Sequence, residues 1–245
     1  MVQKKKNVFV TGASRGIGKG IANWFIENGY NVAFGFKESV EYLHNPKSLP
    51  NLITLRVDIE DRVSIKKAIQ EAQSHFGDSI DILVNNAAIA QEKEFENITD
   101  ADWDKMLAVN LRGAFSFSQE VIPAMKEKKW GRIVNISSIG GQVGGLNQVH
   151  YAASKAAIIN LTMSIAKLYS DIGITCNCIS PGLIKTDMSN KEIFSKKGKN
   201  KIQTIPLKRV GSIEEIVDSV GFLASEKASY ITGQTINVNG GMYFG

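Results

Sequence analysis

The chain has 245 residues, of which 43% are hydrophobic and 22% charged, which is the composition of a globular protein with a sizeable core. It contains no apolar run of about 18 residues, the length that a membrane-spanning helix needs. Its first residues, MVQKKKNVFV, contain basic side chains but no apolar segment of signal-peptide length. We therefore expect a cytoplasmic protein.

The formal net charge of +5 is distributed unevenly, because the segment 191–201 (KEIFSKKGKNK) contains five lysines and one glutamate. Two interpretations stay open for it: a solvated surface loop, or a mobile substrate lid over about 187–205 that attracts an anionic ligand or an acidic carrier. No basic helix or RNA-binding aromatic signature accompanies the lysines, so we do not expect a nucleic-acid partner. Cys176 and Cys178 lie in a strand-like segment and predict buried free thiols, with no metal site and no disulfide.

Seven short apolar segments predict β-strands, and they alternate with stretches in which apolar residues recur at helical spacing. In chain order the expected strands are Val8–Val10, Val32–Phe36, Ile53–Val57, Ile80–Val84, Arg132–Ile136, Thr175–Ile179 and Thr235–Val238. The expected helices run from the glycine-rich turn to Asn28-Gly29, through Ile65 to Phe76, over Asp102–Met125 as one long helix or a helix pair, over Gln148–Tyr169, and through Ile213 to Ala224.

This alternation predicts an α/β protein with a Rossmann-type, doubly wound fold, in which helices cover both faces of a seven-stranded, mostly parallel sheet. A closed eight-stranded barrel is the alternative. The glycine-rich turn directly after the first strand favours the open form, whose ligands bind beyond the carboxyl ends of the strands. No repeat, linker or compositional break divides the sequence, so we expect one domain over residues 1–245.

Gly12, Gly16 and Gly18 follow the first strand and open the first helix. Glycine there permits a tight turn and a close backbone approach, and the start of a helix offers N–H groups to a pyrophosphate. The spacing G-x3-G-x-G is a weak signature alone, but strand, turn and helix fall where dinucleotide binding requires them. The alternative is a turn that only joins two elements.

The end of the second strand distinguishes NADP from NAD, because an acid there holds a ribose hydroxyl whereas a basic residue holds a 2′-phosphate. Lys37 occupies that place and Arg15 lies in the glycine loop, so we predict NADPH as the cofactor. Glu38 is the argument for NAD, but it lies one position further into the following loop. A higher kcat/KM with NADH than with NADPH would contradict the prediction.

Tyr151 and Lys155 lie four residues apart on an expected helix, so their side chains share one face. Lowering a phenol pKa from about 10 to about 7 requires roughly 4 kcal/mol. An ammonium roughly 4 Å away, at an effective dielectric of about 20, supplies about that much. We therefore expect a general acid/base pair, with Ser138 folded toward the phenol by the glycine-rich stretch between them. The alternative is a chance pair.

These motifs occur in a fixed order: TGASRGIG at 11–18, Asn85-Asn86-Ala87, Asn110, Ser138, Tyr151 with Lys155, and Pro181-Gly182 with Thr186. In this order they resemble the short-chain dehydrogenase/reductase family over essentially the full length. The closing residues ITGQTINVNGGMYFG, together with SRGIG, most resemble the reductases that act on 3-oxoacyl thioesters of acyl carrier protein in fatty-acid synthesis.

The resemblance implies four catalytic residues. Tyr151 protonates the substrate carbonyl oxygen while the nicotinamide delivers hydride to its carbon, and Ser138 holds that oxygen by a hydrogen bond. Lys155 lowers the phenol pKa and bonds the nicotinamide ribose. Asn110 positions a water that returns protons to Lys155.

The resemblance also implies a cofactor site and a homotetramer, which family members form through the long helices after strands four and five. In such proteins Asp58 contacts the adenine, and Ile184 and Thr186 flank the carboxamide. The expected cofactor-binding residues are Gly12, Ser14, Arg15, Gly16, Ile17, Gly18, Lys37, Asp58, Ile59, Asn85, Ala87, Tyr151, Lys155, Pro181, Gly182, Ile184 and Thr186.

Two departures from the family pattern bear on the cofactor and on the substrate. Ala88 stands where the family usually has glycine, which costs about 1 kcal/mol if the backbone there needs a positive φ. Asp171 and Ile172 precede Gly173, where carrier-protein reductases often have an arginine. We expect Lys128, Lys129 and the lysines of 191–201 to compensate as carrier contacts.

Three other functions compete with a carrier-protein reductase. A dehydrogenase of a sugar, polyol or other small alcohol would use the same fold and the same catalytic residues. A dinucleotide-binding protein without turnover would not need the complete set of Asn110, Ser138, Tyr151 and Lys155. A serine hydrolase using Ser138 and His150 lacks the G-x-S-x-G elbow, and we expect His150 to point away from Tyr151.

Overall fold

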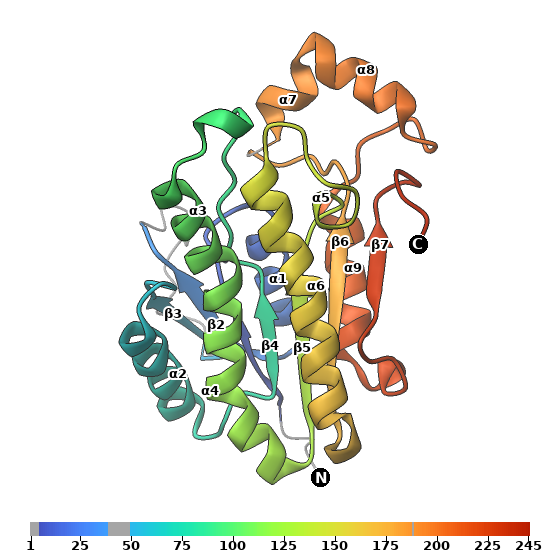
Figure 1. The fold of residues 1–245 in the computed structure, drawn as a ribbon. Coiled ribbons are helices and arrows are strands. Elements are labelled where there is room, and N and C mark those ends of the chain that lie inside the picture. Colours follow the sequence, from blue (N-terminus) through green and yellow to red (C-terminus); the bar gives the residue numbers. More distant parts are fainter. Residues whose placement is uncertain (1–4, 39–49, 188) are drawn as a thin grey trace.

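The computed structural model describes residues 5–38, 50–187 and 189–245 (Figure 1). Within these residues seven parallel strands form one sheet in the order β3–β2–β1–β4–β5–β6–β7. The strands are β1 (Asn7–Val10), β2 (Asn31–Phe36), β3 (Leu52–Arg56), β4 (Ile82–Asn85), β5 (Gly131–Ile136), β6 (Ile174–Pro181) and β7 (Thr235–Val238). The sheet ends at β3 and at β7, so the doubly wound prediction is confirmed and the barrel alternative is wrong.

The central strands are buried on both faces, which explains their nearly continuous apolar sequence. In β1, Val8 and Val10 pack in a cluster with Phe25, whereas Phe9 faces the opposite layer. The ring centroids of Phe9 and Phe117 lie 5.0 Å apart there. Alternate residues of one strand therefore anchor two separate helical layers.

Helices cover both faces of the sheet (Figure 1). One face carries α1 (Gly16–Glu27) and α9 (Ile213–Ala224), and the other carries α2 (Arg62–Phe76), α4 (Gly113–Lys128) and α6 (Val149–Tyr169). The remaining helical segments are α3 (Asp100–Leu107), α5 (Gly140–Val143), α7 (Asn190–Phe194), α8 (Lys196–Thr204), η2 (Phe95–Asn97), η3 (Ala108–Arg112), η4 (Ser170–Ile172) and η5 (Glu226–Ala228).

The region Asp102–Met125, where we expect one long helix or a helix pair, changes its helical type along its length. α3 continues directly into the π-helical turn η3, which continues directly into α4. A π turn inserts one extra residue, and such turns occur frequently at functional sites. It places Asn110, buried at 2% exposure, toward the protein interior.

Most of the described part of the segment 187–205 is helical and not a surface loop, whereas the interpretation as a mobile substrate lid stays a prediction. The Ser195 hydroxyl accepts the N–H of Gly198 at 2.9 Å and caps α8. Ile193 and Ile205 are buried against Leu183 in a small separate core. The sequence conceals this helix, because α8 contributes little apolar surface and its lysines obscure the helical period.

No helix in the described part of the chain has the length and the apolar character needed to cross a membrane. Cys176 and Cys178 lie on β6 and are buried free thiols, as predicted.

The strand order reverses between β1 and β4, and in open α/β sheets the ligand crevice lies at such a switch point, beyond the carboxyl ends of the strands. The glycine loop follows β1, Asn86 follows β4, Ser138 follows β5 and Pro181 ends β6. The predicted site residues therefore gather at one edge of the sheet.

Candidate active site

The glycine loop between β1 and α1 is held tightly against the end of β4. Gly12 has φ +65°, and a Cβ atom added there would lie 2.7 Å from the Cα of Ala87. A Cβ at Gly18 would lie 2.3 Å from the carbonyl oxygen of Gly12. Both positions therefore require glycine, since any side chain would push the loop away from β4.

Two polar residues fix this loop, and neither is among the expected cofactor-binding residues. The Thr11 hydroxyl accepts the N–H groups of Asn86 and Ala87, each at 3.0 Å. The Asn86 amide donates to the carbonyl oxygens of Thr11 and Gly12, each at 3.0 Å. Asn85, the predicted residue, instead donates to Asn135 at 2.8 Å in the interior. The side chain of Asn86, not that of Asn85, therefore supports the loop.

The start of α1 fits a phosphate group. Arg15 is the N-cap residue, no side chain caps the helix, and no acidic residue lies in its first turn. Gly16 has φ +54°, and a Cβ there would meet nothing closer than Thr186 at 3.8 Å. The half-buried Ser14 lies in the turn, and Ile17 packs against the core. Exposed N–H groups and an open glycine surface are what a pyrophosphate requires.

An ion-pair cluster occupies the ends of β2 and β3. Lys37 follows β2 directly, and its Nζ lies 3.1 Å from an Asp58 oxygen and 3.0 Å from a Glu60 oxygen. These two carboxylates, Glu60 first, raise the pKa of Lys37. Lys105 also pairs with Glu60. Ile59 packs beneath Gly113, so Ile59 can offer only its backbone to a ligand.

The hydroxyl groups of Ser138 and Tyr151 meet at the carboxyl end of β5. The two side chains lie close enough for Ser138 to lower the pKa of the phenol, and the Ser138 oxygen accepts the N–H of Gly140 at 3.2 Å. Lys155, which is 3% exposed, donates to the carbonyl oxygen of Ile136 at 2.8 Å. The neighbouring Ser137 is buried and donates to the carbonyl oxygen of Lys155 at 2.8 Å. Ser138, not Ser137, therefore faces the phenol.

The electrostatics of this pair differ from the expectation based on the sequence. Burial raises the pKa of Tyr151, and the hydrogen bond from Ser138 offsets only part of that effect. Burial also lowers the pKa of Lys155 to about 8. The Lys155 Nζ lies 5.8 Å from the centroid of the Tyr151 ring, and its ammonium donates a hydrogen bond to the Ile136 carbonyl. Lys155 alone therefore does not bring the phenol pKa to about 7 here.

Asn110 ties the loop after β4 to the helix that carries Tyr151. Its Oδ1 accepts the N–H of Ile89 at 2.9 Å, and its Nδ2 donates to the Ile89 carbonyl and to the Ser154 hydroxyl, each at 3.0 Å. Ser154 in turn donates to the carbonyl oxygen of Tyr151 at 2.7 Å. Ser154 is a positioning residue that the sequence did not single out. The proton-returning role of Asn110 stays a prediction.

We expect Asn110→Ala to lower the free energy of unfolding by about 2–3 kcal/mol, because the buried polar groups of Ile89 and Ser154 lose their partners. Urea denaturation at pH 7 measures the change. Asn97→Ala, an exposed asparagine in η2, is the matched control and should stay within about 0.5 kcal/mol of the parent protein. Equal stability of the two variants would contradict a stabilising role for the hydrogen bonds of Asn110 to Ile89 and Ser154.

The residues after β6 close the same edge. Pro181 ends β6, and its carbonyl accepts the N–H of Ile139 at 2.9 Å, next to Ser138. A Cβ at Gly182 would lie 2.7 Å from the Cα of Asn239. Ile184 bridges to Gly211, and Thr186 faces Gly16. Thr186 therefore borders the glycine loop, and the binding of the cofactor by these residues stays a prediction.

The chain has close relatives among characterised enzymes. A family model described as Enoyl-(Acyl carrier protein) reductase matches residues 12–243. The chain is 42% identical over 244 residues to the 3-oxoacyl-[acyl-carrier-protein] reductase of Staphylococcus aureus (strain Mu50), covering 97% of this chain and 98% of that enzyme. It is 41% identical to the reductase of that name from Buchnera aphidicola subsp. Schizaphis graminum, with 98% of each covered. The Salmonella typhimurium (strain LT2) counterpart is 38% identical, with 97% of each covered.

The chain belongs to the short-chain dehydrogenase/reductase family. As a short-chain dehydrogenase/reductase it is an oxidoreductase that acts on a keto or hydroxyl group with a nicotinamide dinucleotide. The residue that departs from the family pattern, Ala88, is not among the described residues with positive φ, so the substitution of glycine there introduces no backbone strain.

The contacts of Ser138 and His150 do not support a hydrolase. His150 is fully buried, and its Nε2 lies 2.8 Å from the Oε1 of Gln91. The Gln91 Nε2 donates to Asp102 at 2.9 Å, which orients its oxygen toward the ring and assigns the proton to His150 Nε2. His150 therefore fastens the loop after β4 to α6. Gln91 was not identified from the sequence, because its neighbours in the chain carry no motif.

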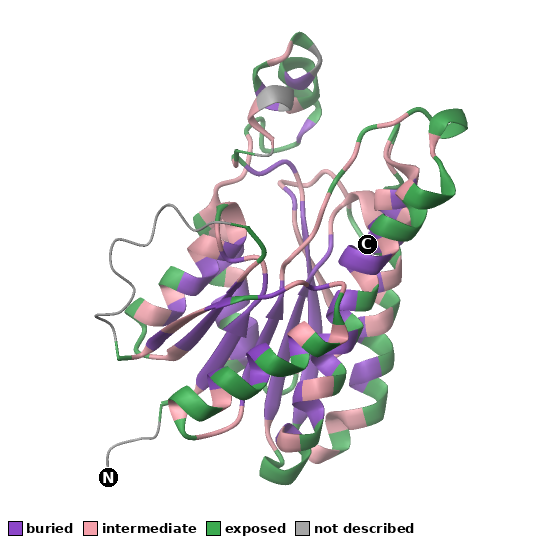
Figure 2. Cartoon of the chain, turned by 90° about the vertical axis from the view of Figure 1, so that its left-hand side faces the viewer, coloured by how far each residue is buried: buried purple, intermediate pink, exposed green. Residues whose placement is uncertain are grey.

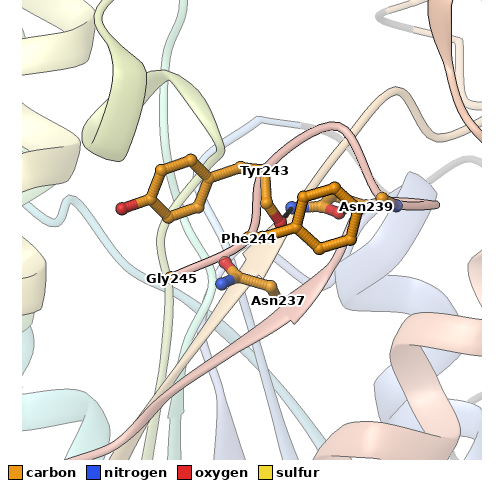
Figure 3. Close-up of a pocket in the computed structure, with 6 residues that line it drawn as sticks. Asn237, Asn239, Tyr243, Phe244 and Gly245 are labelled. Atoms are coloured by element: carbon orange, nitrogen blue, oxygen red, sulfur yellow. Dashed lines mark hydrogen bonds between the residues drawn. The ribbon is translucent and has the colours of Figure 1, made fainter.

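Two hollows lie near the C-terminus, and the second is lined in part by Ile184, one of the expected cofactor-binding residues. The first, of about 410 Å³, is lined by Asn237, Asn239, Gly241, Tyr243, Phe244 and Gly245 (Figure 3). The second, of about 450 Å³, lies between the end of β7 and the return from α8. Neither is lined by Ser138, Tyr151 or Lys155, and in Figure 3 the rings of Tyr243 and Phe244 lie on opposite sides of the terminal segment.

Proposed function

We propose that this protein reduces a 3-oxoacyl thioester, carried on acyl carrier protein, to the 3-hydroxyacyl thioester in fatty-acid synthesis, with NADPH as reductant. The observation that carries the proposal is the meeting of the Ser138 and Tyr151 hydroxyls, beside the buried Lys155, at the edge where the glycine loop opens. Relatives of 38–42% identity that are named for this reaction support it.

The proposed mechanism assigns one task to each side chain. The bound nicotinamide dinucleotide supplies the hydride. Ser138 donates a hydrogen bond to the substrate carbonyl oxygen, and Tyr151 transfers its proton to the same oxygen as negative charge develops there. Lys155 places a cation beside the developing charge and holds the cofactor ribose. Asn110 keeps the helix of Tyr151 in register through Ser154.

The preference for NADPH is assigned to Lys37. This lysine lies at the first position after β2, and the exposed Glu38 lies at the second. Lys37, which pairs with Asp58 and Glu60 in this structure, would hold the 2′-phosphate of NADPH, and Arg15 in the glycine loop would be the second basic residue near it.

We expect Lys37→Ala to lower kcat/KM for NADPH by about tenfold or more, because a charge-assisted hydrogen bond contributes about 1.5–3 kcal/mol. The value for NADH should change by less than about threefold, since it has no 2′-phosphate. Steady-state kinetics with both cofactors give the ratio, and Lys66→Ala on α2 is the control. An equal loss with NADH and NADPH would reject the assignment.

One substrate panel tests the reaction itself. NADPH oxidation is followed with acetoacetyl thioester, with the matching 2-enoyl thioester, and with a set of sugars, polyols and small ketones. Turnover of the 3-oxo thioester alone agrees with the proposal. Faster turnover of a polyol or sugar would favour the small-alcohol dehydrogenase, and faster turnover of the enoyl thioester would favour the reaction in the family description.

We further propose a homotetramer that assembles through α4 and α6. Both helices leave large apolar side chains at the surface, Phe115 at 43% and Met163 at 38% exposure. Light scattering after size-exclusion chromatography measures the mass, and a monomer at micromolar concentration would contradict the assembly.

A further inference from the structure

The helix α8 presents a face covered with lysines. Its sequence KKGKNKIQT contains four lysines and no acidic residue. Gly198 is buried and Ile202 half-buried, and their spacing of four residues turns one face of α8 toward the protein. Lys196, Lys199 and Lys201 are exposed on the remainder of the helix. We call these three residues the lysine face.

The lysine face stands over the edge of the sheet that holds the active site. In Figure 1, α7 and α8 project beyond the carboxyl ends of the strands, and Figure 2 shows the same projection from a second direction. The chain reaches them through Thr186, which faces the glycine loop, and returns through the buried Ile205. A macromolecule that delivers a substrate to Tyr151 from this edge therefore approaches beside α8.

The other lysine pair considered from the sequence is less suited to an acidic partner. The Nζ of Lys128 lies 3.0 Å from Asp78 and 2.8 Å from Asp81, so its charge is already balanced within the protein. The exposed Asp171 lies on the short turn η4 after α6, where a basic contact would otherwise stand. Lys128 is therefore a weaker candidate than the lysine face, and the expectation that Lys128 and Lys129 contact the carrier stays a prediction.

We propose that the lysine face of α8 docks the carboxylate-rich surface of the carrier protein that presents the 3-oxoacyl thioester. This inference rests on the proposed function. Lysines are strongly hydrated point charges, so they steer an acidic partner and bind it reversibly in a salt-dependent way. The exposed Phe194, 67% accessible at the end of α7, adds an apolar contact beside the charges.

The test compares one thioester on and off its carrier. The kcat/KM is measured for acetoacetyl-acyl carrier protein, for acetoacetyl-N-acetylcysteamine and for acetoacetyl-coenzyme A. The variant is Lys196→Gln/Lys199→Gln, and the control is Lys66→Gln/Lys67→Gln, which removes the same charge from exposed positions on α2. Binding of the non-acylated carrier, followed by fluorescence anisotropy, provides a readout that needs no turnover.

We expect the ratio of kcat/KM for the carrier thioester to that for the N-acetylcysteamine thioester to fall about fivefold in the α8 variant and to stay unchanged in the control. The Kd of the non-acylated carrier should rise by the same factor. At about 0.5 M salt, where the Debye length is well below 8 Å, the difference between variant and parent should vanish.

Three results would overturn the proposal: an unchanged ratio and Kd, an equal loss with all three thioesters, or a loss with coenzyme A as large as that with the carrier, which would assign the face to small phosphates. Failure of the reductase function itself looks different. In that case the parent protein reduces neither thioester, whereas carrier binding that depends on Lys196 and Lys199 would still support the docking face.

Discussion

Replacing Tyr151 by phenylalanine is expected to lower kcat for thioester reduction by about 10³-fold or more, within the range seen when a general acid is removed. The ring keeps its packing, whereas the substrate oxygen loses the only donor in the Ser138–Tyr151 pair whose proton is transferred. Ser138 continues to hold the oxygen but supplies no proton, so the protonation that accompanies hydride transfer is lost. Stopped-flow and steady-state assays with acetoacetyl thioester measure the loss.

The Kd of NADPH, followed by fluorescence, should stay within severalfold in the same variant, because the glycine loop is untouched. Tyr169→Phe is the matched control, since Tyr169 lies at the far end of α6 and should retain full turnover. Substantial turnover by Tyr151→Phe would show that another group donates the proton.

Replacing Lys155 by methionine is expected to abolish reduction and at the same time to stabilise the fold. Burial lowers the pKa of Lys155 from 10.5 to about 8, which corresponds to a cost of about 3 kcal/mol for the charged form. Methionine removes this cost but leaves the Ile136 carbonyl without its donor, which costs about 1 kcal/mol. At pH 7 we therefore expect a net gain of about 2 kcal/mol.

The pH dependence gives a sharper test of the same change. Between about pH 8 and 10.5 the unfolded chain holds a proton on Lys155 that the folded chain has released, so this group makes the parent protein more stable as pH rises. Lys155→Met lacks that contribution, and its advantage should be full below about pH 8 and fall toward pH 10.5. Lys167→Met, at an exposed position on α6, should show no such trend. A variant less stable than its parent at pH 7 would contradict the buried-charge cost.

Periodicity was sufficient to predict the strands and the amphipathic helices from the sequence. The strand at Thr235–Val238 has the predicted bounds, and α2 begins and ends at residues with local physical causes, the Asp61 cap and the left-handed Gly77. α8 was missed because Ile202 is the only large apolar residue it turns inward. A short helix with one inward apolar residue shows no helical periodicity of apolar residues in its sequence.

The candidate site shows a similar division. Residue type and spacing were enough to bring Ser138, Tyr151 and Lys155 to one place, but not to assign the roles of their neighbours. Asn85 and Asn86 are adjacent and chemically identical, and only the register of β4 decides which one turns toward the glycine loop. The pKa values likewise depend on burial and on the Ile136 carbonyl, neither of which a spacing of four residues can specify.

Two hydrogen bonds of opposite direction join the end of β5 to the helix α6. Lys155 donates to the Ile136 carbonyl, and Ser137 donates to the Lys155 carbonyl. These two hydrogen bonds, and not the connecting segment, fix the distance between Tyr151 and Ser138. Parts of that segment are fixed as well, since Gln142 accepts a hydrogen bond from Ser180 at 2.8 Å and the Asn147 carbonyl accepts one from the N–H of Lys93 at 2.8 Å. The side chains of Val143 and Leu146 are exposed, so they can change to accept a differently shaped acyl group while the reactive pair stays in place.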